Sequence, residues 1–75
     1  MDNSFNKKLG AWLREKRQKK NISQVEAARR MGCVKSRICN WEKGTRGLDA
    51  GELFRYCAII GADLNEFVEE YKKSN

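Results

Sequence analysis

The apolar residues of this chain recur at intervals of three and four positions, and no segment alternates as a β-strand would. The first stripe predicts a helix over about 5–19 and consists of Phe5, Leu9, Trp12 and Leu13. The last stripe predicts a helix that starts after residue 63 and consists of Leu64, Phe67, Val68 and Tyr71. With three shorter helices between them, these patterns predict an all-α domain of five helices.

Capping residues and glycines mark where the central helices begin and end. Ser23 and Glu26 have the spacing of a capping box, and the helix that they start ends at Gly32. Asp49 starts a fourth helix in the same way, and that helix ends at Gly61. The second and third helices are joined by a tight glycine turn, so they are expected to cross steeply, as in a helix-turn-helix unit.

The third helix, over about 34–43, is short and has an unusually polar outer side. Ile38 and Trp41 anchor it on the core, which leaves outside the residues Lys35, Ser36, Arg37 and Asn40. An ordinary solvated face is one explanation. The other is DNA recognition, since the major groove, about 12 Å wide, admits one α-helix and its base edges require donors and acceptors of this kind.

The charge of the chain is unevenly distributed. Residues 1–46 hold thirteen Lys and Arg against four Asp and Glu, whereas residues 47–75 hold three against six, for a formal net charge of +6. A basic part of this kind suggests a polyanion such as nucleic acid as partner, although a solvated basic helix is the alternative.

The side chains that carry metal, redox or catalytic chemistry are scarce. The chain has three cysteines, no C-x-x-C pair and no histidine, which predicts no disulfide framework, no metal site and no cofactor. The cysteines are expected to be mostly buried, in a protein of the reducing cytoplasm. With no histidine and no paired acids on a common face, an enzyme is not expected, nor are a small-molecule ligand and a membrane span.

The central segment SQVEAARRMGCVKSRICNWEKG, residues 23–44, resembles the helix-turn-helix of the lambda-repressor/Cro-like family, also called XRE-like. The matching elements are Ser23-Gln24, Ala28, Gly32, Ile38 and the Glu42-x-Gly44 ending. The resemblance implies a five-helix, lambda-repressor-like domain over residues 1–75, with the helix-turn-helix at about 23–43. Val34 departs from the family pattern, because Ser or Thr usually caps the third helix there.

The resemblance also implies roles for individual residues. Lys35, Ser36 and Asn40 occupy positions that contact bases, and Arg37 lies where a base or a phosphate contact is expected. Gln24 occupies the position that meets a DNA phosphate. Phosphate contacts are further expected just past the third helix and from the first one, at Lys43, Thr45 and Arg46 and at Lys7, Arg14, Lys16 and Arg17. Arg17 and Glu42 are expected to form a structural ion pair.

The function expected from these features is that of a sequence-specific regulator of transcription, a repressor that binds a two-fold-symmetric DNA operator as a homodimer. Since no sensor domain is expected, a phage or mobile-element repressor, a restriction-modification controller or an antitoxin-like regulator is favoured. Phe67 and Tyr71 are expected at the dimer interface, and Leu64 and Val68 in the core. The alternative function is a protein-interaction module, an adaptor or antitoxin-like protein that keeps the fold without binding specific DNA.

Overall fold

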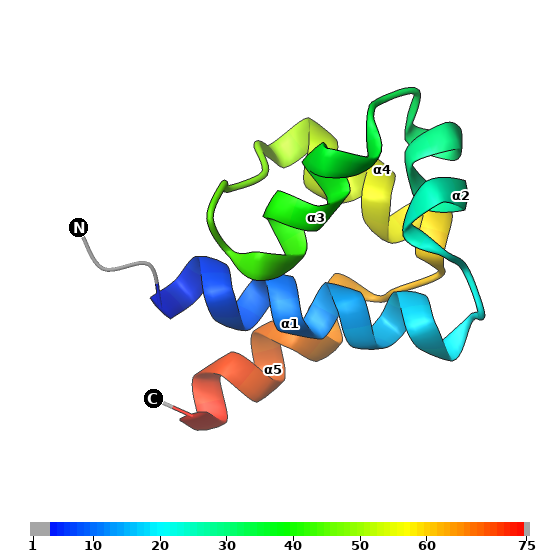
Figure 1. The fold of residues 1–75 in the computed structure, drawn as a ribbon. Coiled ribbons are helices and arrows are strands. Elements are labelled where there is room, and N and C mark those ends of the chain that lie inside the picture. Colours follow the sequence, from blue (N-terminus) through cyan, green and yellow to red (C-terminus); the bar gives the residue numbers. More distant parts are fainter. Residues whose placement is uncertain (1–3, 75) are drawn as a thin grey trace.

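The computed structural model describes residues 4–74 and confirms the all-α prediction (Figure 1). Within these residues there is no strand, and the helices are α1 (Ser4–Lys19), α2 (Gln24–Met31), α3 (Lys35–Lys43), α4 (Ala50–Ile60) and α5 (Leu64–Ser74). Their limits nearly coincide with the predicted ones, because local caps and glycines determine them. None of the described helices is long and apolar enough to cross a membrane.

The predicted capping box of α4 is complete, but that of α2 is only half formed. At α4 the Glu52 amide donates to Asp49 at 2.7 Å, and the Asp49 amide donates to the Glu52 carboxylate at 3.0 Å. At α2, Ser23 Oγ accepts from the Glu26 amide at 3.0 Å, whereas the Glu26 carboxylate bonds Arg29 and Arg30 instead. The two arginines offer charged donors one turn away, and they lower the pKa of Glu26 to about 2.

Two glycines permit the arrangement of the central helices, one by its backbone conformation and one by a close approach. Gly32 ends α2 with a φ of +73°, the left-handed conformation predicted for the turn before α3. Gly10, in the middle of α1, lies directly against the end of α3, where a Cβ would overlap the carbonyl oxygens of Trp41 and Glu42. The absence of a side chain at Gly10 therefore lets α1 support the third helix.

The core lies where α1, α2, α3 and α4 meet, and α5 covers the opposite side of α1 (Figure 1). The largest fully buried side chains are Leu13, Ile38, Trp41, Tyr56 and Ile60. Among the cysteines only Cys57 is buried, and Cys33 and Cys39 are half-buried. The expectation that the cysteines are mostly buried is therefore met at only one of the three.

The orientation of α5 differs from the prediction. Phe67 is only 6% exposed and its ring packs on Trp12 with a centroid distance of 5.5 Å, so it belongs to the core and little of its surface is left for the expected dimer contact. Val68, which was expected in the core, is 42% exposed. The helical period indicated an apolar stripe on α5, but Phe67 and Val68 are adjacent within it. Packing on the aromatic residues of α1 selected Phe67.

Candidate nucleic-acid interface

The outer face of α3 presents a group of polar side chains that do not contribute to the core. Lys35, Ser36, Asn40 and Lys43 are exposed and, with the half-buried Cys39, they line one shallow hollow. On the opposite side of the helix, Ile38 and Trp41 are buried. The predicted base-contacting residues Lys35, Ser36 and Asn40 are therefore brought together on one accessible surface.

Arg37 does not lie on that surface. Its guanidinium is 3.7 Å from Glu52 at the start of α4, on another side of α3. Each residue advances about 100° around an α-helix, so Arg37 is turned well away from Lys35. The long ion pair with Glu52 draws Arg37 toward α4, but its side chain is 41% exposed, so its contact with a base or a phosphate stays a prediction.

A second hollow adjoins the first and is bordered by cationic and amide groups. It is lined by Arg14 of α1, Gln24 at the start of α2, and Cys39, Glu42 and Lys43 of α3. Arg14 and Lys43 are exposed, and among the described residues neither forms an ion pair. Such cations, beside the N-terminus of a helix, suit an oxyanion such as phosphate.

Thr45 and Arg46 follow α3 in an exposed loop beside the same surface. The Thr45 amide donates to the Asn40 carbonyl oxygen at 3.1 Å, and Thr45 Oγ1 lies 3.4 Å from Asn40 Oδ1. This loop therefore lies against the last turn of α3, next to the amide of Asn40.

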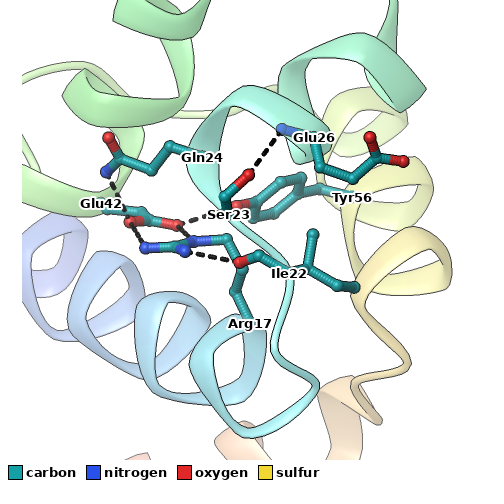
Figure 2. Close-up of polar contacts among 7 residues, drawn as sticks. All are labelled: Arg17, Ile22, Ser23, Gln24, Glu26, Glu42 and Tyr56. Atoms are coloured by element: carbon teal, nitrogen blue, oxygen red, sulfur yellow. Dashed lines mark hydrogen bonds and ion pairs between the residues drawn. The ribbon is translucent and has the colours of Figure 1, made fainter.

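The expected ion pair between Arg17 and Glu42 is present and buried (Figure 2). Arg17 Nε and Nη2 donate to the two Glu42 carboxylate oxygens at 2.7 and 2.9 Å, and Nη1 donates to the Ile22 carbonyl oxygen at 2.7 Å. The side chains are only 7% and 2% exposed. Since its nitrogens point inward and are engaged, Arg17 is not available to a phosphate, and that part of its assignment is wrong.

Two further side chains bond the same carboxylate. Gln24 Nε2 donates to Glu42 Oε1 at 3.0 Å, and Tyr56 Oη donates to Glu42 Oε2 at 2.8 Å (Figure 2). Burial alone would raise the pKa of Glu42, but the bonds from Arg17, Gln24 and Tyr56 outweigh it and lower that pKa. Burial and the neighbouring carboxylate raise the pKa of Tyr56. The Glu42 carboxylate is therefore ionised, and it accepts hydrogen bonds from Arg17, Gln24 and Tyr56.

The sequence analysis did not identify Tyr56, because no pattern in the residues around it indicates a hydrogen bond to Glu42. A tyrosine in an apolar stripe looks like an ordinary core residue, and its hydroxyl meets Glu42 only because α4 crosses the end of α3. The alignment of Arg17 with Glu42, in contrast, was indicated by the family pattern.

Lys16 lies on a different side of α1 from the hollow at Arg14. Its Nζ is 3.1 Å from Glu66 of α5 and lies over the ring of Trp12, 5.5 Å from the centroid. The hydrogen bond to Glu66 raises the pKa of Lys16. Lys16 is therefore engaged by Glu66 on the α5 side of α1, and its expected phosphate contact stays a prediction that this ion pair does not favour.

The start of α3 has no side-chain cap. Val34 occupies the N-cap position in an extended conformation, and its side chain makes no capping hydrogen bond, as its departure from the family pattern indicated. Within residues 4–74, no group of three or more Cys, Asp or Glu side chains is placed to hold a metal ion.

Comparison with known proteins agrees with this arrangement. A helix-turn-helix family model matches residues 13–67. The ImmF control region 10 kDa protein of Bacillus phage phi105 is 34% identical over 59 residues, which are 79% of this chain; the chain spans 66% of that protein's length. Two crystal structures of the clp gene regulator ClgR from Corynebacterium glutamicum match 92% of the chain at 25% identity. Their TM-scores are 0.81 and 0.82, and 90% and 73% of those chains are covered. The matched residues contain the whole segment from Arg17 to Glu42, and the chain belongs to the helix-turn-helix family that its resemblance to lambda-repressor/Cro-like proteins predicted.

Proposed function

We propose that this protein is a cytoplasmic regulator of transcription that binds a specific double-stranded DNA operator, inserts α3 into the major groove and represses the adjoining gene. The observation that carries the proposal is the outer face of α3, where Lys35, Ser36 and Asn40 stand free of the core beside the cationic hollow at Arg14 and Lys43. A merely solvated helix does not require unpaired cations gathered at its edge.

Each residue of that face has a chemistry that suits a base edge. Lys35 is a donor for the O6 and N7 acceptors of guanine, and the Asn40 amide can pair with both N6 and N7 of adenine. Ser36 can donate or accept. Cys39 lies between them and is the less polar member of the face.

Phosphate contacts are assigned to the residues that border the face. Arg14, Lys43 and Arg46 supply positive charge, and Thr45 a hydroxyl. Gln24 stands at the first turn of α2, where the helix dipole favours an anion. These contacts set the position of the protein on the duplex and carry no sequence information.

The first test is the loss of sequence preference when base contacts are removed. An operator is selected from random double-stranded DNA, and binding of Lys35→Ala and Ser36→Ala is measured on that operator and on random DNA. We expect each change to cost about 1–3 kcal/mol on the operator and much less on random DNA.

Arg37→Ala is the matched control, since it removes a cation from α3 on the side that faces α4. It should leave the ratio of operator to random binding unchanged. If Lys35→Ala lowered the affinity for the operator and for random DNA equally, Lys35 would contact a phosphate and not a base. No selected sequence at all would favour the protein-interaction module.

We further propose that the protein binds as a homodimer on a two-fold-symmetric operator, with its two α3 helices about 34 Å apart. Phe67 being buried, the contact is assigned to the apolar surface beside it, where Tyr71 is half-buried and Phe5 and Val68 are 45% and 42% exposed. These three residues line one largely apolar hollow between α1, α4 and α5, with Lys72 at its border. An isologous contact places this surface of one copy against the same surface of the other.

Val68→Asp tests the dimer more cleanly than Tyr71→Asp, because Tyr71 also packs on the rings of Phe5 and Phe67, at 5.2 and 5.7 Å. We expect Val68→Asp to weaken binding to the full operator about tenfold or more, because a carboxylate would be desolvated in the contact. Binding to a half-site and helicity should be unchanged.

Lys73→Ala is the control, since it changes the net charge equally at an exposed position of α5. It should retain full-operator binding. Unchanged cooperativity in Val68→Asp, measured by titration of full and half operators, would move the dimer surface elsewhere.

A further inference from the structure

Four helices of this protein converge on a single carboxylate. Glu42 of α3 is bonded by Arg17 of α1, Gln24 of α2 and Tyr56 of α4 (Figure 2). The Tyr56 ring is fully buried and stacks edge-on against Trp41, with a centroid distance of 5.6 Å. The last turn of α3 is thus held by polar bonds from every helix that surrounds it.

The position of this carboxylate connects it with the DNA-facing surface. Glu42 lies between Trp41, which is buried, and Lys43, which lines both hollows of the surface. Gln24, a partner of Glu42, borders the cationic hollow. The distance between the phosphate contacts of α2 and the base contacts of α3 therefore depends on where the Glu42 carboxylate is held.

Because the first turn of α3 lacks a side-chain cap, the bonds to Glu42 in its last turn contribute more to holding this helix in place. Val34 provides no side-chain cap, so the first turn lacks the hydrogen bond that usually satisfies one of its backbone amides. While Arg17 and Gln24 bond the carboxylate from α1 and α2, the Tyr56 hydroxyl reaches it from α4. It does so on Oε2, the oxygen that also accepts from Arg17 Nε.

We propose that Tyr56 is a positioning residue for sequence recognition: its hydroxyl orients Glu42 and thereby holds α3 at the spacing from α2 at which bases and phosphates are met together. The proposal rests on the DNA-binding function proposed above. Tyr56 itself touches no DNA, because it is fully buried behind α3. Its effect must be on discrimination between sequences, since non-specific binding needs only the cations.

Tyr56→Phe removes the hydroxyl and keeps the ring. Affinities are measured for the selected operator and for random DNA, at a temperature where every variant is folded. We expect the ratio of the two to fall about tenfold, less than the removal of a whole base contact can cost, with random-DNA binding nearly unchanged. Amide hydrogen exchange of residues 35–43 in the free protein should become faster.

Two controls separate positioning from a loss of stability. Ile60→Val destabilises the fold at a fully buried site of α4 outside the network, so it should leave the ratio unchanged and speed the exchange of α3 no more than that of the other helices. In a Glu42→Gln background, Tyr56→Phe should reduce the ratio little further, since it acts through that carboxylate.

An unchanged ratio in Tyr56→Phe, an equal fall in Ile60→Val, or full additivity with Glu42→Gln would each overturn the proposal. If Glu42→Gln does not fold, the hydrogen exchange of α3 in Tyr56→Phe against Ile60→Val decides. A wild-type protein without any preference between operator and random DNA would instead contradict the proposed function.

Discussion

Raising the salt concentration from 50 to 200 mM is expected to weaken operator binding by roughly 10²- to 10⁴-fold. About four to eight phosphates neutralised per dimer give a log–log slope of about −4 to −7, because each neutralised phosphate releases condensed counterions. The cationic side chains exposed at the proposed interface include Arg14, Lys43 and Arg46. Titrations at four or more salt concentrations measure the slope.

Single substitutions assign the slope to particular residues. Arg14→Gln and Lys43→Gln should each make it shallower by about one unit for every phosphate that is no longer neutralised. Lys16→Gln should not change it, because Lys16 is bonded to Glu66 on the side of α1 that α5 covers. A slope near zero in the wild type would mean that the cationic hollow does not meet phosphates, and an effect of Lys16→Gln equal to that of Arg14→Gln would refute the assignment.

Glu42→Ala is expected to destabilise the fold by about 3–5 kcal/mol, since it leaves the Arg17 guanidinium buried without its counter-ion. Gln24 and Tyr56 lose an acceptor in the same step. Domains of this size are only marginally stable, so a loss of this order removes much of the total and lowers Tm by about 15–30 °C. Thermal unfolding followed by circular dichroism measures the change.

Glu69→Ala serves as the matched control. Glu69 also forms an ion pair, at 3.8 Å to Lys72, but both side chains are about two-thirds exposed or more, at 67% and 71%. Exposed pairs contribute little because solvent screens them. Tm should hardly move, and a Glu42→Ala variant that melts as close to the wild type as Glu69→Ala does would show that the buried network contributes no more than a surface pair.

Local signals in the sequence were sufficient to place the helices. Ser23 and Asp49 begin helices because their side chains accept hydrogen bonds from amides of the first turn. Gly32, Gly44 and Gly61 end helices because glycine adopts a positive φ without strain. Both effects act within a few positions along the chain. The family pattern then placed Lys35, Ser36 and Asn40 on one face of α3 and paired Arg17 with Glu42.

What only the tertiary structure decided is the rotation of each helix about its own axis, and which side chains meet across helices. Phe67 rather than Val68 enters the core, Arg37 turns toward α4, and Lys16 turns toward α5. The hydrophobic period defines a stripe at least about 100° wide, and it does not determine which way a residue at or beyond the edge of that stripe turns. The neighbouring side chain decides this: Trp12 for Phe67, Glu52 for Arg37 and Glu66 for Lys16. The hydrogen bond from the Tyr56 hydroxyl to Glu42 is likewise decided by the tertiary structure. A contact between residues 14 positions apart depends on the angle at which α4 crosses α3, and no local pattern contains that angle.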